Sequence, residues 1–227
     1  MPQRDKPEPV AIDAPIGARK RAELAFQAIA ETNELSLLVP AIWSALNVAV
    51  STRKTSFHTP MVASVDGDGA PHVRVMVLRG VDAIRRCIQF NCDERSAKRL
   101  DMRPNAPMAV TGYDAAMKQQ IRLEGDYRPM SEHDASAAWE VTKPMSRRCY
   151  LADPGPGSAL EMPGAGLPPE LIDRSPTPEE SAPAQAFFHP FHIEITSIDW
   201  LYLAHSGHRR AQFRWDGTDW NGNWSVP

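Results

Sequence analysis

Three short segments decide the expected fold: Arg74-Val-Met-Val-Leu-Arg79, Asp93-Glu-Arg-Ser-Ala-Lys98 and Gln120-Ile-Arg-Leu-Glu-Gly125. The first and third alternate polar with apolar side chains, as strands with one buried face do. The second places cationic and hydroxyl groups where a loop enters a helix, and the unpaired N–H groups of a helix start favour anions. Together the segments predict a β-barrel that binds an anionic ligand, with a phosphate monoester as the best fit.

Each segment also has a simpler interpretation. Val73, Val75 and Val77 share one face of the first strand, which suits the core, so Arg74 faces a partner on the other side. That partner is either a ligand or a carboxylate on a neighbouring strand, for example Glu124. The group Arg95, Ser96 and Lys98 is either a phosphate site or the capped start of a charged surface helix.

Composition limits the class of protein. The 227 residues, 42% hydrophobic and 23% charged, suffice for one domain with a core and disfavour two. A net charge of −3 argues against nucleic-acid or anionic-membrane binding, and no apolar run approaches the roughly 20 residues of a membrane span. The polar amino terminus lacks the pattern of a secretory signal, so we expect a cytoplasmic protein. Cys87, Cys92 and Cys149, an odd number without CxxC spacing, disfavour disulfides and structural zinc.

The rest of the chain predicts a mainly β domain with peripheral helices. We expect a flexible arm over residues 1–17 and a single domain over 18–227. Between about 152 and 190 lie nine of the 21 prolines, which predicts a long loop that serves as a lid, a partner-binding arm or a disordered segment. Periodicity predicts helices at 18–31, 40–50, 96–102 and 131–139, and strands at 61–65, 71–79, 85–91, 107–113, 119–128, 191–198 with 200–203, 208–215 and after Gly217.

The order and spacing of these motifs resemble the FMN-binding split barrels of the pyridoxamine 5′-phosphate oxidase superfamily, especially its Alr-type branch. The likeness covers most of residues 43–151 and 191–227. It implies a six- to eight-stranded antiparallel split β-barrel, a homodimer, and hydride transfer through N5 of bound FMN. By this resemblance the residues that hold FMN are Arg74, Val75, Met76, Val77, Leu78, Arg79, Asn91, Arg95, Ser96, Lys98 and Gln120.

The substrate side departs from the oxidases proper. Their carboxyl-terminal Arg-x-His-x-Arg run holds the vitamin phosphate, whereas His208 and Gln212 stand here in place of two arginines. Glutamine does not reproduce a bidentate arginine contact, so the natural substrate is expected to differ from pyridoxamine phosphate. The substrate-side candidates are Trp139, Lys143, Arg147, Arg148, His208, Arg210 and Gln212; for Arg147 and Arg148 the alternative is an ordinary surface charge.

Three functions remain open at this point. The first is an FMN-dependent oxidoreductase acting on a small substrate, the second an authentic pyridoxamine-phosphate oxidase, and the third a non-catalytic flavin- or haem-binding protein. The seven histidines form neither an HExxH motif nor a His/Cys cluster, so no metal is expected. The four carboxyl-terminal tryptophans favour a core or a dimer interface: Trp200, Trp215, Trp220 and Trp224.

Overall fold

The computed structural model describes Gln27 and residues 29–227. The arm expected over residues 1–17 lies outside the described residues, as does most of the helix expected over 18–31. Within the described part, no helix combines the length and apolar character needed to cross a bilayer.

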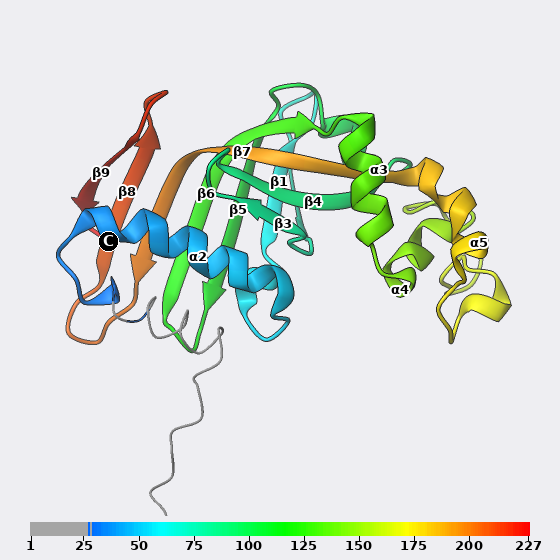
Figure 1. The fold of residues 1–227 in the computed structure, drawn as a ribbon, viewed down its shortest axis with the longest axis horizontal. Coiled ribbons are helices and arrows are strands. Elements are labelled where there is room, and N and C mark those ends of the chain that lie inside the picture. The colour runs from blue at the N-terminus through cyan, green and yellow to red at the C-terminus, as the bar shows by residue number, and fades with distance from the viewer. Residues whose placement is uncertain (1–26, 28) are drawn as a thin grey trace, which may run out of the picture.

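The described chain forms one antiparallel sheet of nine strands with helices around it (Figure 1). The mainly β fold with peripheral helices is therefore confirmed. The ninth strand, one more than the expected six to eight, is the three-residue β3, which periodicity cannot detect in so short a segment. The strands are β1 (Met61–Val65), β2 (Pro71–Val75), β3 (Gly80–Asp82), β4 (Cys87–Asp93), β5 (Pro107–Asp114), β6 (Gln119–Pro129), β7 (Phe188–Tyr202), β8 (Arg209–Trp215) and β9 (Trp220–Ser225).

Strand β7 is the branch point of the sheet. The strands run in the order β2-β1-β5-β6-β7-β4-β3, and β8 also pairs with β7 while β9 pairs with β8. One edge of β7 follows β6 along its length, whereas the other edge pairs with β4 through its first half and with β8 through its second half. The register with β6 shifts at Glu124/Gly125, where β7 carries an extra residue. A bulge of this kind bends a strand, and here it directs the two halves of β7 to different neighbours.

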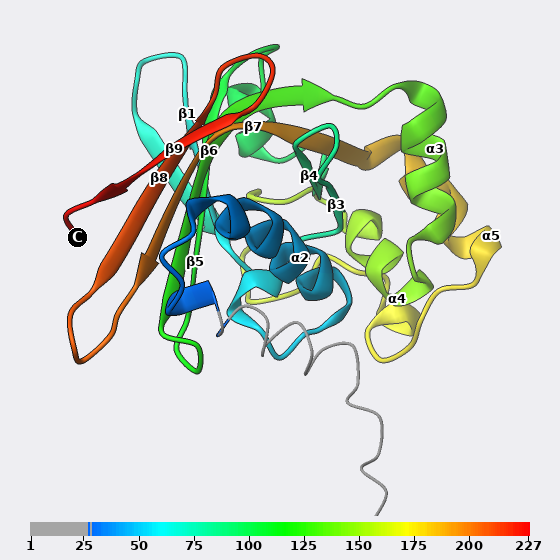
Figure 2. The same cartoon turned by 60° about the vertical axis from the view of Figure 1, so that its left-hand side comes forward.

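Helix α2 (Leu38–Ser51) lies on the concave side of the curved sheet (Figure 2). Its buried face carries Leu38, Ile42 and Leu46, one helical turn apart, and these pack into the main core with sheet residues such as Ile121 and Trp200. The helix begins two residues before the predicted Pro40, because a proline is tolerated within the first helical turn.

A second, smaller core lies beyond the sheet. Helices α3 (Glu132–Val141), α4 (Pro144–Arg147) and α5 (Pro178–Ser181) gather at the end of the molecule opposite β8 and β9 (Figure 1). Trp139, Tyr150, Ala184 and Phe188 form its buried cluster. Phe188 opens β7, so the same strand runs from this cluster into the main core.

The segment expected as a long loop contains short helices. Between residue 152 and the start of β7 at Phe188 lie α5 and two 3-10 helices, Pro169–Leu171 and Ala182–Phe187. Thr177 and Glu180 form a capping box at the start of α5. Local capping thus gives structure to a proline-rich stretch that lacks periodicity.

The faces predicted for the 71–79 strand are reversed. Val73 and Val75 are 63% and 65% exposed, while Met76 and Leu78 are buried. The prediction was wrong because β2 is an edge strand whose valine face points out of the barrel. Strand β2 also ends at Val75, since the following amides bond elsewhere: those of Met76 and Leu78 donate to Pro60 and His58, and that of Arg79 donates to Gln89.

Replacing Gly125 by alanine tests the role of the bulge. A Cβ at this position would lie 2.1 Å from the Glu194 carbonyl oxygen, so the backbones must separate. We expect the free energy of unfolding to fall by about 1–3 kcal/mol, the usual cost of overpacking, in urea denaturation. Gly67→Ala is the control, because its nearest neighbour would be 3.7 Å away. Equal stability of the two variants would contradict the close approach of β6 and β7.

Candidate functional site

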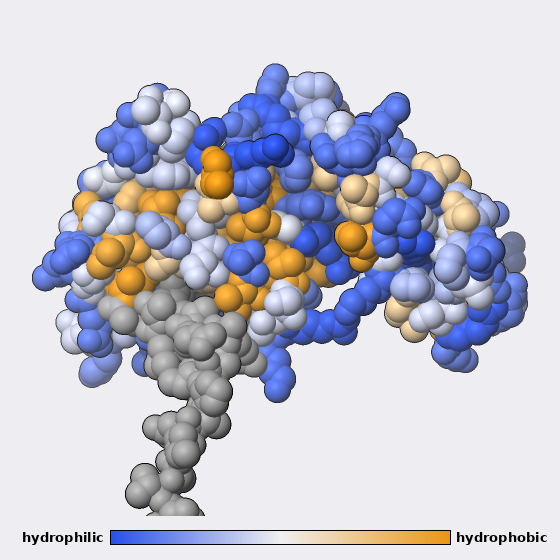
Figure 3. Space-filling view, viewed as in Figure 1, coloured by the Kyte–Doolittle hydropathy of each residue, from blue (hydrophilic) through white to orange (hydrophobic). Residues whose placement is uncertain are grey.

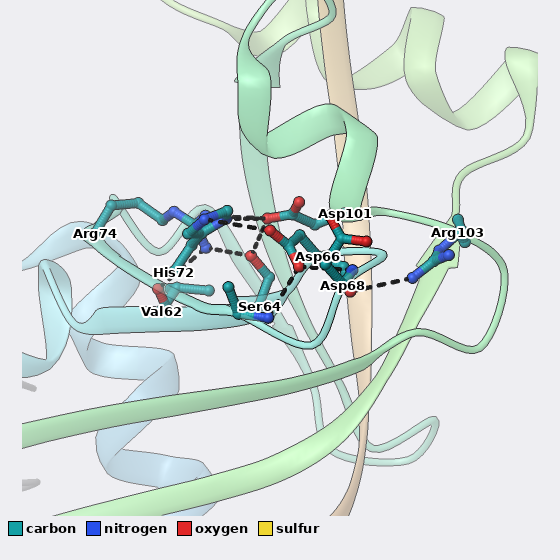
Figure 4. A network of polar contacts seen from close by, with 9 residues as sticks. Val62, Ser64, Asp66, Asp68, His72, Arg74, Asp101 and Arg103 are labelled. Atoms are coloured by element: carbon teal, nitrogen blue, oxygen red, sulfur yellow. Dashed lines mark hydrogen bonds and ion pairs between the residues drawn. The ribbon is translucent and has the colours of Figure 1, made fainter.

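Arg74 lies in a buried polar network beneath the 3-10 helix Ala97–Asp101 (Figure 4). Its Nη1 donates to the Ser64 hydroxyl at 2.7 Å, and its Nη2 lies 3.4 Å from Oδ2 of Asp101. The same carboxylate oxygen accepts from Ser64 at 2.6 Å and lies 3.1 Å from Nδ1 of His72. The carboxylate partner of Arg74 is therefore Asp101 instead of the Glu124 considered from the sequence.

Asp101 is 3% exposed and needs this network to keep its charge. Burial acts to raise its pKa, but the hydrogen bonds from Ser64 and His72 and the charges of His72 and Arg74 outweigh burial and lower the pKa below 3.8. The carboxylate is thus ionised at neutral pH. The carboxylate binds one edge of the Arg74 guanidinium. The guanidinium N–H groups that make none of these contacts are available to a ligand.

Arg95 and Ser96 are engaged in contacts within the protein. Arg95 forms a double hydrogen bond with Asp93 through Nε and Nη2, at 3.0 and 2.7 Å, and donates to the Ala152 and Tyr150 carbonyls at 2.9 and 3.2 Å. The bonds to Asp93 raise the pKa of Arg95 further. Ser96 is buried, and its hydroxyl donates to the Asp93 carbonyl at 2.6 Å. Both side chains thus donate to Asp93 or to the 150–152 carbonyls, and their role toward a phosphate stays a prediction.

Other predicted cofactor residues keep free donors. Among the residues that the structure describes, Lys98, Arg79 and Gln120 have no side-chain hydrogen bond or ion pair in the protein, while Asn91 accepts from Gln89 at 3.3 Å. In the 75–78 segment, Met76 and Leu78 are core side chains and Val75 is exposed. Met76 and Leu78 could therefore contact a ligand only through their backbone, and their amides already donate hydrogen bonds within the protein.

A cavity of about 770 Å³ lies between the sheet, α3 and the end of α2. Gln89, Asn91 and His192 line it from the outer face of β4 and β7, since these positions alternate with the buried Ile88, Phe90 and Ile193. Arg79 and Lys143 line it as well, so the structure brings together Arg79, Asn91 and Lys143 from the predicted set. The surface is hollowed between the part over α2 and the part over α3 and α4 (Figure 3). The volume is in the range of small-molecule sites.

Gln89, His192 and Arg53 are among the lining residues that the sequence analysis did not identify. Gln89 lies two residues before Asn91 on the same face of β4, and this alternation was sufficient to find it. His192 belongs to the alternating strand β7; burial lowers its pKa below 6.5, so its imidazole is neutral at pH 7. Arg53 follows α2 in a turn, where no periodic signal exists.

Trp139 does not face the cavity. It is 2% exposed and packs edge to face against Tyr150 and Phe188 in the second core. Its assignment to the substrate side is therefore corrected. The helical position was right, but the aromatic side chain is buried on the opposite side of α3 from the cavity-lining Asp134 and Val141.

Arg147 and Arg148 are also committed to the fold. Arg147 is 8% exposed and donates to the Trp139 and Thr142 carbonyls at 2.7 and 2.9 Å, which completes the last turn of α3. Arg148 donates to the carbonyls of Leu171 and Ile172. Neither lines the cavity, and neither is the free surface charge considered as its alternative.

The carboxyl-terminal candidates lie away from the cavity. His208 precedes β8, Arg210 forms a double contact with Asp199 at 3.0 and 2.6 Å, and Gln212 accepts from Ser225 at 2.9 Å. Strand β8 is at the end of the molecule opposite α3 (Figure 1). Within one chain, these residues and the cavity do not form a single site.

The residues present fit FMN in part. Lys98 and the outer edge of Arg74 offer cationic donors for a phosphate, and Asn91, Gln120 and Arg79 offer hydrogen bonds to a polar ring system. Arg95 and Ser96 fit less well, because most of their hydrogen bonds are made within the protein.

The antiparallel sheet of nine strands with its peripheral helices has the split-barrel fold, which a solved FMN-binding protein described below shares. Residues 40–131 match the family described as pyridoxamine 5′-phosphate oxidase, FMN-binding domain. The chain thus resembles the pyridoxamine 5′-phosphate oxidase-like superfamily, as its sequence motifs predicted, and that prediction is confirmed.

Two curated relatives are pyridoxine/pyridoxamine 5′-phosphate oxidases. The one from Azotobacter vinelandii is 34% identical over 93 residues, or 41% of this chain and 42% of the relative. The one from Pseudomonas putida strain GB-1 is 30% identical over 112 residues, or 49% of this chain and 51% of the relative. The chain therefore spans about half the length of these relatives.

Two solved structures share the fold over most of the chain. A pyridoxamine 5′-phosphate oxidase-related, FMN-binding protein from Nostoc punctiforme has a TM-score of 0.65 at 24% identity, and covers 83% of this chain and 96% of its own. PhzG from Burkholderia lata, in complex with tetrahydrophenazine-1-carboxylic acid, has a TM-score of 0.62 at 19% identity, and covers 87% and 94%.

Asp101→Asn tests the network beneath Arg74. The amide keeps the shape but loses the charge that three donors share, so we expect a loss of about 1.5–3 kcal/mol in the free energy of unfolding at pH 7, the range for charged hydrogen bonds. The pKa of this carboxyl is lower in the folded protein than in the unfolded chain. Its contribution to the free energy of unfolding is therefore present above pH 3.8 and is lost as the pH falls through the lower pKa of the folded state. Urea unfolding from pH 7 to pH 2.5 should show the two proteins converging in acid. A constant difference across this range would contradict the ionised carboxylate.

Proposed function

We propose that this protein is an FMN-binding oxidoreductase that acts on a small, as yet unidentified substrate. The observation that carries the proposal is the cavity with three cations from separate elements, Arg53, Arg79 and Lys143, none of which has an ion pair among the described residues. Unpaired positive charges around a cavity attract an anionic ligand. The likeness to the FMN-binding domain family over 40–131 supports FMN as the cofactor.

The chain's own residues would bind and orient the substrate. FMN, when bound, supplies hydride transfer at its N5 position. Lys143 would hold an anionic group of the substrate, and Gln89 would donate to or accept from its polar atoms. Val50 and Val81, which are partly buried against the core, add apolar walls that reduce access of water.

A second copy of the chain would complete the site, and we propose a homodimer. The outer face of the sheet leaves apolar side chains exposed on β1, β2 and β5: Met61, Val65, Val73, Val75 and Tyr113. Such a contiguous face is typical of an interaction surface. Strand β8, which carries Arg210 and Gln212, lies at the end of the molecule opposite α3 (Figure 1), and a partner could present these residues to the cavity of the other chain.

Two alternatives remain testable. The names of the curated relatives favour an authentic pyridoxamine-phosphate oxidase, while His208 and Gln212 in place of arginines argue against it. Oxygen-dependent formation of pyridoxal phosphate would distinguish the two. A non-catalytic flavin carrier would bind FMN without undergoing reduction by NAD(P)H. We keep a cytoplasmic location, without nucleic-acid or membrane binding, as part of the proposal.

Lys98→Ala tests the phosphate end of the cofactor site. The variant should bind FMN more weakly by about 1.5–3 kcal/mol, since a charge-assisted hydrogen bond is lost, while its affinity for riboflavin stays the same. Fluorescence titration with both flavins measures this difference. Lys54→Ala removes an equal charge at an exposed turn and should change neither affinity. If wild-type protein bound riboflavin as tightly as FMN, the phosphate site would be refuted.

Val75→Lys tests the homodimer. A lysine buried in the interface without a partner is costly, so the dissociation constant of the dimer should rise about tenfold or more, which corresponds to about 1.4 kcal/mol. Analytical ultracentrifugation measures this constant. Ile84→Lys is the matched control, because Ile84 is 93% exposed and lies outside this face. Wild-type protein that stays monomeric at every concentration, with FMN present, would exclude the dimer.

A further inference from the structure

We propose that Arg95 is a positioning residue that fastens residues 150–155 and Phe187 to the turn after β4. In this role it connects the wall of the cavity to the 3-10 helix that carries Lys98. The connection to the cofactor rests on the proposed function, whereas the fastening itself does not.

Three segments that are distant in sequence meet at the Arg95 guanidinium. It donates to Asp93 at 3.0 and 2.7 Å, to the Ala152 carbonyl at 2.9 Å and to the Tyr150 carbonyl at 3.2 Å. Its central carbon also lies 3.8 Å from the centre of the Phe187 ring. These contacts use four of the five guanidinium N–H groups and one of its faces.

The backbone around Arg95 is adapted to this arrangement. A Cβ on Gly155 would lie 3.1 Å from Cδ and Nε of Arg95, so glycine allows the chain to pass directly over the side chain. The Phe187 carbonyl accepts from the Glu94 amide at 2.8 Å, and the Asp153 amide donates to the Gly166 carbonyl at 2.7 Å. The hydrogen bond between Asp153 and Gly166 therefore closes the loop of residues 153–166, and Arg95 attaches this loop to the barrel.

Electrostatics favour this role over phosphate binding. Asp93 is 7% exposed, and Arg95 is its ion-pair partner. To bind a phosphate through its Nε and Nη2 edge, Arg95 would have to release a buried carboxylate, which is costly, and only one N–H group on Nη1 lies outside these contacts. Lys98 has no ion pair among the residues that the structure describes, so it can bind a phosphate without leaving a carboxylate unpaired.

The fastened segment continues the wall of the cavity. Lys143 precedes α4 and Ser146 lies within it, and both line the cavity. The chain leaves α4 through the 3-10 helix Arg148–Leu151 and reaches Ala152, whose carbonyl Arg95 holds. Release of Arg95 should therefore loosen the wall that carries Lys143.

The test compares Arg95→Ala, Gly155→Ala and Arg99→Ala. Gly155→Ala disturbs the contact from the opposite side while Arg95 keeps its charge. Arg99 is the matched control, because it pairs with Glu94 at 2.9 Å in the same turn and has no contact with the 150–155 segment. Hydrogen exchange of residues 150–166, measured by mass spectrometry without added flavin, reports the fastening. Titration with FMN and with riboflavin reports phosphate recognition.

We expect exchange over 150–166 to become at least about tenfold faster in Arg95→Ala and Gly155→Ala, and to stay unchanged in Arg99→Ala. The ratio of FMN to riboflavin affinity should stay within about twofold of wild type in all three. A tenfold loss of this ratio in Arg95→Ala but not in Gly155→Ala would show that Arg95 contacts the phosphate and would overturn the proposal. If Arg95→Ala does not fold, unchanged exchange in Gly155→Ala overturns it. Failure of wild-type protein to bind FMN would refute the proposed function and leave the exchange result intact.

Discussion

The pairing of β7 with β6 is the constraint on which the rest of the structure depends. Strand β7 has 15 residues, and along the edge not taken by β6 it pairs first with β4 and then with β8. This division requires β7 to bend between Ile195 and Ser197, where the bulge lies and where Gly125 permits the two backbones to approach closely. The first half of β7 then forms the outer surface against which α3 lies, and the second half places β8 and β9 at the opposite end. The cavity lies beside the first half of β7, where His192 lines it.

Arginine side chains in this protein fall into two groups, and the difference is set by their acceptors. Arg95, Arg147 and Arg148 donate to backbone carbonyls or a buried carboxylate, and they hold segments in place. Arg53 and Arg79 lie at the cavity without such acceptors in the described chain. Because a guanidinium has a fixed number of donors, hydrogen bonds made to the fold are withdrawn from ligands. A phosphate motif read from residue types alone does not separate the two groups.

The strands and the class of fold could be predicted from the sequence because period-two alternation is a local property. Asn91, Arg79 and Lys143 were also predicted, and the structure brings them to one cavity. The valine face of β2 was predicted wrongly, since alternation defines two faces but does not say which one is inside for an edge strand. Arg95 and Trp139 find their partners about 50 residues away in the chain or in a second core, and no local pattern contains that information. Arg53 could not be found because a turn residue has no periodicity.

The placement of β7 near the carboxyl end of the chain has a consequence for biosynthesis. Strand β4 pairs with residues more than 90 positions later, and the β7-facing edge of β6 also pairs with residues 191–202. While a ribosome makes the chain, both strand edges stay open until residues 188–202 emerge, and open edges readily pair with other chains. The two cores share this strand, so neither is closed before it arrives. Until then the edges of β4 and β6 are exposed, and pairing with other chains competes with folding during that interval.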